Sequence, residues 1–427
     1  MVTQSKNIIR YFNSILLLIL LSGLTPLAAA EIEFGGHLKF FYTYSDFPDK
    51  SVFYEQADPY RESLGNLRLK AEANTGNWDG QLHYVLNGLY STDLNNCYLR
   101  GGISGRGCRE LASDQTQLLD LSSIISVSDD YVLYQRIDRL LVAYATEKLV
   151  TRVGRQAISW GNGVVYNPLD LFNPFPPDAI DTEYKPGEDM LYLQGLFSNG
   201  SDLQALYIPR RDPVSGDVTS AQSALAGKYH WLSAGHEVDF LAAINYGDAV
   251  LGTAYTGEWN DNVVSASLSV TQTDSGNVWS AQTSYNYSAM LYQKNLSGFV
   301  EFFYNGFGLK GDQHSFQDVV DQDDLFSRLL RGELYTIGRF YVATGAVLEA
   351  TPLLNLNPIL FVNLSDGSAL LQFIGTYSLS QNFDLLAGFN LPMGKDGTEY
   401  GGLETESEQG KVVAPADTLF ARLAWYF

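Results

Sequence analysis

The sequence predicts an all-β chain that closes into a transmembrane antiparallel β-barrel of about 18 strands, with about 16 as the alternative count. Three observations predict this fold. The chain starts with a short apolar leader, continues as segments of about 10 to 14 residues with alternating polarity, and ends in an alternating segment that finishes on Phe427. After the leader, no stretch approaches the roughly 18 consecutive apolar residues that mark a membrane-spanning helix, which excludes a helical membrane protein.

The leader is typical of a secretory signal peptide. Lys6 and Arg10 precede a short apolar run (ILLLILL), and three alanines close the segment as a cleavage site. The run is far shorter than the roughly 20 residues needed to span a bilayer. We therefore divide the chain into a signal peptide, 1–30, and a barrel, 31–427, and expect export through the Sec pathway.

The last ten residues alternate between two faces, as a β-strand requires. One face is apolar enough for lipid and ends on Phe427. This segment resembles the C-terminal strand of Gram-negative outer-membrane barrels, in which a terminal aromatic residue helps the barrel-assembly machinery recognise the chain. The resemblance implies an outer-membrane location, with lipid, lipopolysaccharide and the barrel-assembly machinery as partners.

Composition agrees with a barrel. Tyr (27) and Phe (23) suit aromatic girdles at two membrane interfaces, and Gly (39) suits many short turns. The net charge of −21 becomes −23 once Lys6 and Arg10 leave with the leader. This acidity argues against nucleic-acid binding, which requires a basic face.

Two kinds of connection alternate along the chain, as short periplasmic turns and long extracellular loops do in such barrels. Counting both kinds gives eighteen strands and places both termini on the periplasmic side. The short turns lie at 76–77, 147–148, 199–200, 235–236, 260–261, 294–295, 351–352 and 381–382. The outer connections lie at 47–62, 93–129, 161–188, 212–224, 247–248, 274–276, 307–333, 365–368 and 395–416.

The two faces of the clearest strands predict a polar lumen inside an apolar outer surface. In 66–74, Leu67 and Leu69 point outward while Arg68 and Lys70 point inward. We expect a set of charged side chains to line the pore: Lys39, Arg68, Lys70, Glu72, Arg139, Arg152, Arg155, Arg339 and Arg422. The cations either form a positive ladder that favours anions, or each pairs with a neighbouring carboxylate.

Arg152 and Arg155 differ by three positions, so a regular strand cannot turn both toward the lumen. Either a β-bulge re-aims one of them, or one extends to the membrane interface. The sequence around them, Val153-Gly154-Arg155-Gln156 followed by Trp160, resembles a Gly-Arg-Gln strand motif of porin-like families that include alginate-export-type barrels. The resemblance implies a barrel with a charged lumen that passes solutes.

The segment 161–188 is rich in proline, which removes backbone donors and restricts φ, so we expect a stiff loop. Its apolar side chains need burial, and the loop therefore either caps the mouth or folds inward to constrict the lumen. The residues assigned to this role are Asn167, Pro168, Phe172, Asn173, Pro174 and Pro177.

Two cysteines, Cys97 and Cys108, lie in a glycine-rich outer segment. In an oxidising periplasm they are expected to form one disulfide that closes a small surface loop.

Catalytic and metal-binding motifs are missing from the sequence. None of the five histidines stands beside a Gly-x-Ser-x-Gly motif, and neither HExxH nor a phosphate-binding glycine loop occurs. We expect no enzyme activity, no cofactor and no metal. The expected function is passive diffusion of small hydrophilic solutes. The alternative is a gated exporter or a structural barrel in an envelope complex, and association into homo-oligomers is left open.

Overall fold

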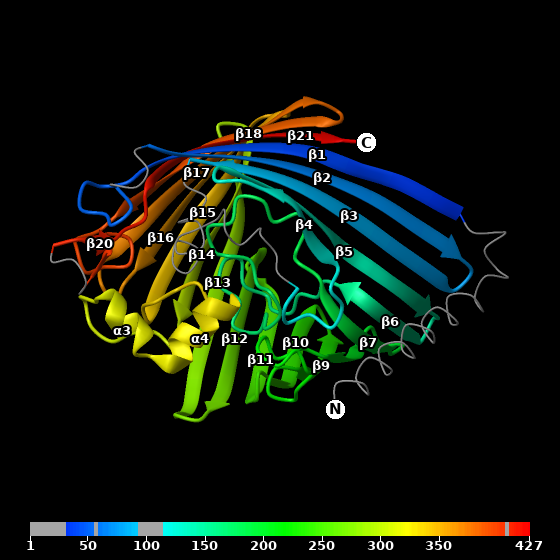
Figure 1. Cartoon of the computed structure of the whole chain (residues 1–427). Coiled ribbons are helices and arrows are strands. Elements are labelled where there is room, and N and C mark those ends of the chain that lie inside the picture. The colour runs from blue at the N-terminus through cyan, green and yellow to red at the C-terminus, as the bar shows by residue number, and fades with distance from the viewer. Residues whose placement is uncertain (1–30, 55–58, 93–113, 406–409) are drawn as a thin grey trace.

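The computed structural model describes residues 31–54, 59–92, 114–405 and 410–427, and in it eighteen antiparallel strands close into one barrel (Figure 1). The first nine strands round the ring are β1 (Glu31–Asp46), β2 (Tyr60–Thr75), β3 (Trp78–Ser91), β5 (Tyr131–Ala145), β6 (Leu149–Gln156), β7 (Glu188–Leu196), β8 (Asp202–Ile208), β9 (Ala224–Ser233) and β10 (His236–Asn245). The other nine are β11 (Asp248–Trp259), β12 (Asn262–Thr273), β13 (Gly276–Leu291), β14 (Lys294–Tyr304), β15 (Phe340–Thr351), β16 (Leu354–Asn363), β17 (Ser368–Ser380), β18 (Phe383–Met393) and β21 (Asp417–Tyr426). The predicted fold class and the count of eighteen are confirmed.

Three short strands lie outside the ring. β4 (Ser122–Val127) pairs with the outer part of β5, on the edge that β6 pairs with farther along. β19 (Leu403–Glu404) and β20 (Val412–Val413) form a small ladder of their own in the loop before β21.

The ring closes between the first and last strands. β1 pairs with β21 in antiparallel register from His37 opposite Tyr426 to Asp46 opposite Asp417. Beyond the strand, the backbone N–H of Phe427 donates to the Gly36 carbonyl, and the Gly36 N–H donates to the Phe427 carbonyl. The C-terminal strand predicted from the alternating ending is therefore the closing strand.

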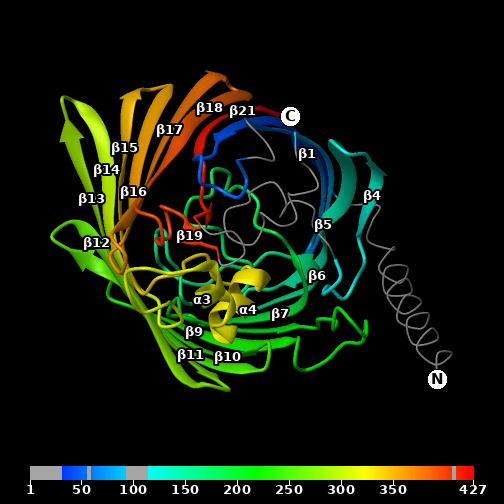
Figure 2. The ribbon, with the colours of Figure 1, turned by 60° about the vertical axis from the view of Figure 1, so that its left-hand side comes forward.

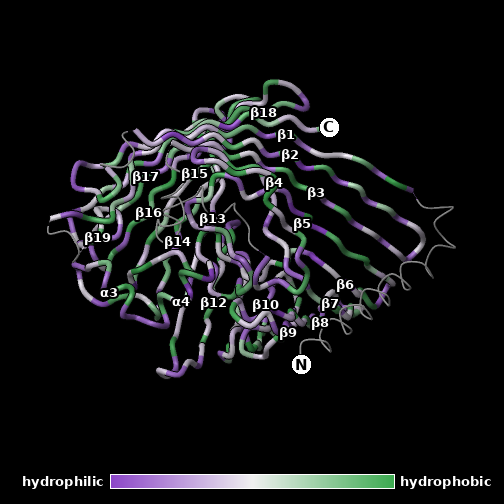
Figure 3. The backbone as a smooth tube through the Cα atoms, in the orientation of Figure 1, coloured by the Kyte–Doolittle hydropathy of each residue, from purple (hydrophilic) through white to green (hydrophobic). Residues whose placement is uncertain are grey.

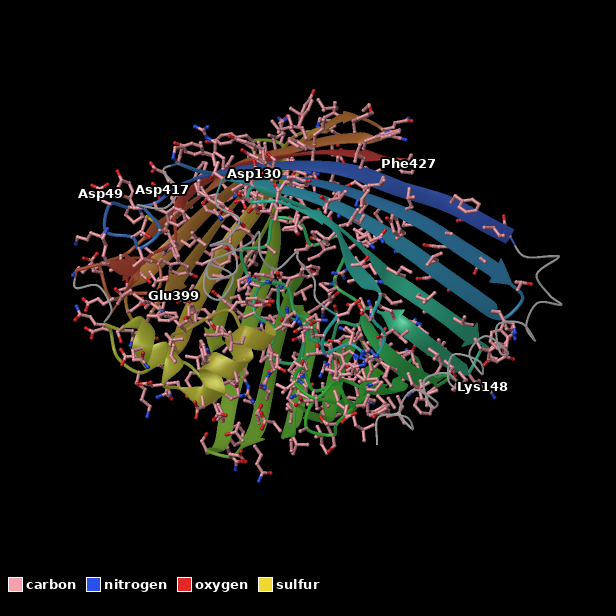
Figure 4. All side chains as sticks on the ribbon, in the orientation of Figure 1. Asp49, Asp130, Lys148, Glu399, Asp417 and Phe427 are labelled. Atoms are coloured by element: carbon pink, nitrogen blue, oxygen red, sulfur yellow. The ribbon has the colours of Figure 1, made fainter. Side chains whose placement is uncertain are left out.

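The two ends of the barrel differ in their connections. At one end the strands join through tight turns, and in the β11–β12 turn Asn260 and Asp261 have φ values of 51° and 63°, which suit a two-residue hairpin. The predicted turn at 294–295 lies two residues earlier, between β13 and β14. Figure 4 places Lys148 at this end and Asp49, Glu399 and Asp417 at the opposite end, where the long connections gather.

Side chains alternate between a lipid-type outer face and an inner face. On β1, Leu38 and Phe40 are 46% and 51% exposed on the outside, whereas Lys39 between them is 2% exposed. Figure 3 shows the hydropathy of the chain alternating along the neighbouring strands. This alternation follows the strand period and matches the faces predicted from the sequence.

The long connection between β14 and β15 contains two helices that the sequence analysis did not predict. α3 (Phe316–Val320) begins with a capping box between Ser315 and Asp318, and α4 (Asp323–Arg331) ends at Gly332 in the left-handed conformation. Both lie at the loop-bearing end of the barrel (Figure 2). None of the helices in the described part of the chain has the length and apolar content needed to cross a membrane.

Two predictions fall outside the described residues. The signal peptide, 1–30, is one of them, and the disulfide between Cys97 and Cys108 is the other.

Candidate functional site

The connection between β6 and β7, residues 157–187, folds into the barrel and is called the inner loop below. Its side chains Trp160, Leu169 and Phe172 are at most 3% exposed. They pack in one apolar cluster with the inward side chains of β7 to β11, such as Met190 and Leu241. Figure 2, which looks obliquely into the barrel, shows green loop segments inside the ring of strands. The apolar residues of this segment are therefore buried against the inner wall.

The tip of the inner loop is held by one carboxylate on the far wall. Glu301 of β14 is fully buried and accepts the backbone N–H groups of Val164, Val165 and Tyr166 at 2.6, 3.0 and 2.6 Å. The Gln282 amide also donates to Glu301, at 2.9 Å. Four donors from two directions fix the carboxylate, and through it the loop tip.

Beside this tip, the inner faces of β12 and β13 form a wall of uncharged hydroxyl groups, called the hydroxyl wall. Its residues, all buried, are Ser265, Ser267, Ser269, Thr271, Thr273, Ser280 and Ser284. Ser265 donates to the Asn162 carbonyl at 2.9 Å, and the Asn162 amide donates to the Tyr255 carbonyl at 2.7 Å. Ser265 lies only three residues from the start of β12, so the inner loop reaches far down the barrel.

The returning limb of the inner loop crosses to the opposite side of the lumen, where it meets cations. Asp181 bonds Lys39 of β1 at 2.6 Å and lies 3.3 Å from the Arg422 guanidinium of β21. Glu183 bonds the same Lys39 at 2.5 Å and accepts the Tyr426 hydroxyl at 3.1 Å. Burial raises the pKa of Asp181, but the Lys39 ammonium holds this pKa below its usual range.

Deeper in this cationic side, three arginines share one carboxylate. Asp138 of β5 is 1% exposed and pairs with Arg68 at 2.7 Å, with Arg139 at 2.9 Å, and with Arg136. The ring of Tyr184 from the inner loop stacks on Arg68, with 4.0 Å from the guanidinium carbon to the ring centre. The cluster carries net positive charge, because three guanidinium groups share one carboxylate.

A buried lysine ties the two limbs of the inner loop together. Lys185 donates to both carboxylate oxygens of Asp170 at 2.6 and 2.7 Å, and also to the Ile158 carbonyl and the Ser159 hydroxyl. Burial raises the pKa of Asp170 and lowers that of Lys185. The bond therefore joins residues fifteen positions apart and makes the loop a closed unit.

The loop that precedes β21 holds another carboxylate, which is half-buried. Glu399 accepts the Tyr341 hydroxyl at 2.7 Å, the Asn363 amide at 2.8 Å and the Ile337 N–H at 3.2 Å. Burial raises its pKa to about 7, because the donor groups only partly offset the loss of water and the Asp366 carboxylate is nearby.

Most of the predicted pore-lining residues do face inward. Lys39, Arg68, Arg139 and Arg422 lie at 2–9% exposure beneath the inner loop, and each pairs with a carboxylate. Their cations therefore follow the paired alternative more closely than a free positive ladder.

Three other members of the predicted pore-lining set are more exposed than these four residues. Glu72 accepts from His83 at 3.4 Å. Lys70 and Arg152 have no carboxylate partner among the described residues, and they lie over the rings of Tyr184 and Tyr192 at 6.0 and 5.1 Å.

Arg155 and Arg339 differ from the prediction. Within the described residues, β6 pairs without a register shift, Arg152 lies opposite inward Ala143, and Gly154 has a φ of 120°. Arg155 is 1% exposed and bonds Asp189 and Asp114, so it braces the wall instead of lining the lumen. Arg339 precedes β15 and bonds the Gly308 carbonyl and the Tyr304 hydroxyl at the rim.

The inner-loop residues singled out from the sequence fall into two groups. Phe172 is in the apolar cluster, and Asn173 donates to Glu188 of β7 at 3.1 Å. The other four lie along a cavity between the inner loop and the wall: Asn167, Pro168, Pro174 and Pro177.

Sequence reasoning missed the three carboxylates that organise the site: Asp138, Glu301 and Glu399. Strand parity places Glu301 on an inward face, which was the available signal for that residue. No short-range pattern marks Glu399, whose three donors come from other segments.

No protein-family model and no curated protein matches the sequence. Solved structures do resemble the fold. A BenF-like porin from Pseudomonas fluorescens Pf-5 is 11% identical with a TM-score of 0.51, over 94% of this chain and 99% of that one. OccK5 (OpdH) from Pseudomonas aeruginosa is 9% identical with a TM-score of 0.53, over 93% and 98%. OccAB2 from Acinetobacter baumannii is 12% identical with a TM-score of 0.51, over 94% and 99%.

Proposed function

We propose that this chain is an outer-membrane porin-like channel through which small hydrophilic solutes diffuse passively. The observation that carries the proposal is the inner loop, which is bonded to facing walls of a closed barrel, to Glu301 on one side and to Lys39 on the other. Such a loop narrows a lumen and presents charged and polar groups to whatever passes.

The fold that this chain shares with solved porins supports the same proposal. A Gram-negative outer membrane is the corresponding location, with lipid and lipopolysaccharide around the barrel. The Gly-Arg-Gln motif adds a distant similarity to alginate-export-type barrels as an expectation, without a polysaccharide substrate. We propose no enzyme activity.

Single-channel recording of the purified barrel in a planar bilayer, with a salt gradient, tests the proposal. We expect stable open steps with a measurable reversal potential. Deleting residues 165–180 should raise the conductance, because it removes the tip that Glu301 holds and part of the apolar cluster. A correctly folded barrel that stays silent, before and after the deletion, contradicts the channel and favours a gated exporter or a structural barrel.

A further inference from the structure

A cavity of about 100 Å³ lies between the inner loop, the inner faces of β10 to β14, and the segment of α4. We infer that this cavity binds a small uncharged polyol of about three carbons. The inference rests on the proposed function, since it names one class of solute that the channel accepts.

The charges around the cavity exclude an ion as the natural ligand. Three acidic side chains line it, and each already has a cation: Asp248 pairs with Arg328, Glu333 with Arg331, and Asp170 with Lys185. An entering anion or cation would lose its water without gaining an unpaired counter-charge, which costs several kcal/mol. An uncharged ligand avoids that cost.

One side of the cavity offers hydroxyl groups. Ser269, Thr271 and Ser280 of the hydroxyl wall line it. The side-chain hydroxyl of Thr271 makes no hydrogen bond to any residue in the described ranges, although its backbone pairs with both neighbouring strands. Ser269 reaches the Ser280 carbonyl only at 3.5 Å. These groups can both donate to and accept from a ligand hydroxyl.

The other side offers apolar faces. The rings of Phe175, Phe303 and Phe307 line the cavity, together with prolines of the inner loop. A polyol matches such a pair of walls, since its hydroxyl groups bond one side and its C–H groups contact the other. A small hydrocarbon would leave the hydroxyl side unsatisfied, and water alone would leave the apolar side wet.

The size of the cavity limits the ligand further. A cavity of about 150 Å³ holds a six-carbon ring such as benzene, so this smaller one suits a three-carbon chain better than a hexose. Tyr335 and Glu333 line it as well; the Tyr335 hydroxyl donates to the Pro174 carbonyl at 2.9 Å, and Glu333 accepts the Asn245 amide at 2.8 Å.

Saturation-transfer NMR with glycerol, on the purified full chain in a detergent whose head group carries no hydroxyl, tests this assignment. We expect saturable transfer to glycerol above that seen with empty micelles. Glycerate, an anion of similar size, should bind at least about tenfold more weakly. Absence of saturable transfer to glycerol, or equal binding of glycerate, overturns the inference.

Paired variants locate the site. The double variant Thr271→Val with Ser280→Ala removes two hydroxyls with little change in shape, and should raise the dissociation constant by about tenfold or more. Ser267→Ala, on the same wall but outside the cavity lining, should leave it unchanged. Equal affinity in the double variant and the wild type contradicts the assignment.

Conductance of the same preparations separates the two proposals. A barrel that conducts but does not bind glycerol overturns this inference alone. A silent barrel that binds glycerol overturns the channel proposal and leaves the cavity as a binding site.

Discussion

Buried and half-buried carboxylates are stabilised in two different ways in the two halves of this barrel. On the side of β1, β2, β5 and β21, Asp138 and Asp181 are held by arginine and lysine. On the side of β14 to β16, Glu301 and Glu399 are held by backbone N–H groups, amides and a tyrosine hydroxyl, with no cation partner among the described residues.

The difference teaches where charge can be changed without moving the inner loop. A carboxylate held by cations belongs to a cluster whose positive charge equals or exceeds the negative charge of the carboxylate. The ion pairs of such a cluster persist at ordinary pH. A carboxylate held by neutral donors has no counter-charge beside it, so its negative charge is stabilised only as far as the number and direction of those donors allow.

The largest effect is expected from Asp138→Asn, which removes the shared carboxylate from Arg68, Arg136 and Arg139. Two buried guanidinium groups and the half-buried one of Arg136 would then repel one another without compensation, and the free energy of unfolding should fall by about 3–5 kcal/mol. Urea unfolding followed by tryptophan fluorescence measures it. Ser267→Ala is the matched change on the uncharged side and should cost about 1 kcal/mol; equal costs would remove the contrast between the halves.

The next effect is expected from Glu301→Gln. The side-chain amide keeps one acceptor oxygen, so part of the set of donors from Val164 to Tyr166 loses its partner, at a cost of about 2–3 kcal/mol. The loop tip should detach while the strands persist, and single-channel conductance should rise. Glu349→Gln is the control, because that carboxylate is exposed and the Asn295 amide is its one donor within the described part of the chain. Unchanged conductance in Glu301→Gln argues against the tip as a constriction.

A smaller and local effect is expected from pH, because the carboxylate contacts in the two halves should depend on pH with opposite sign. Because burial raises the pKa of Glu399 to about 7, the contacts of its loop are strongest when it is protonated, and they weaken as pH rises from about 4.5 through 7. The lowered pKa of Asp181 gives the opposite sign: its tie is complete above about pH 4 and is lost only as pH falls further.

Limited proteolysis between pH 5 and pH 8 checks this contrast. Cleavage after Lys411 should accelerate with pH in the wild type, relative to a reference peptide that corrects for protease activity, and should lose that dependence in Glu399→Gln. Cleavage after Lys185 should not change over the same range. Parallel behaviour at both positions would show that the two kinds of carboxylate respond alike.

The smallest effect is expected from Lys70→Gln and Arg152→Gln, the inward cations without a described carboxylate partner. Removing them should shift the reversal potential slightly toward cations, by an interaction of less than about 1 kcal/mol for each charge. Lys228→Gln, whose lysine is paired with Asp239, is the control. A larger shift from the control would mean that pairing does not decide which charges passing ions meet.

The sequence predicted the barrel well because strand alternation is a local signal. Leu38, Lys39 and Phe40 reveal their faces by parity alone, and the tight turns reveal themselves by residue type. The count of eighteen strands followed from the alternation of short and long connections.

The inner loop was foreseen as a stiff segment, and an inward fold was one of the two courses predicted for it, but its contacts were not foreseen. Its position depends on partners more than a hundred residues away, such as Glu301 for Val164 and Lys39 for Asp181. Strand alternation also failed to predict the face on which Arg155 lies, because the preceding Gly154 has a φ that a residue with a side chain rarely adopts. The apolar inner faces of β7 to β11 broke the polar-inside rule, because the inner loop covers them.

The position of Asp181 has a consequence for the order of folding. It contacts Lys39 on the first strand and Arg422 on the last, which become neighbours only when the ring closes. Glu183 likewise contacts both Lys39 and Tyr426, and it lies 243 positions before Tyr426 in the chain. Contacts between such distant positions form late, after the intervening chain has lost its freedom. The inner loop therefore stabilises the junction between β1 and β21, and it can do so only after these two edge strands have paired.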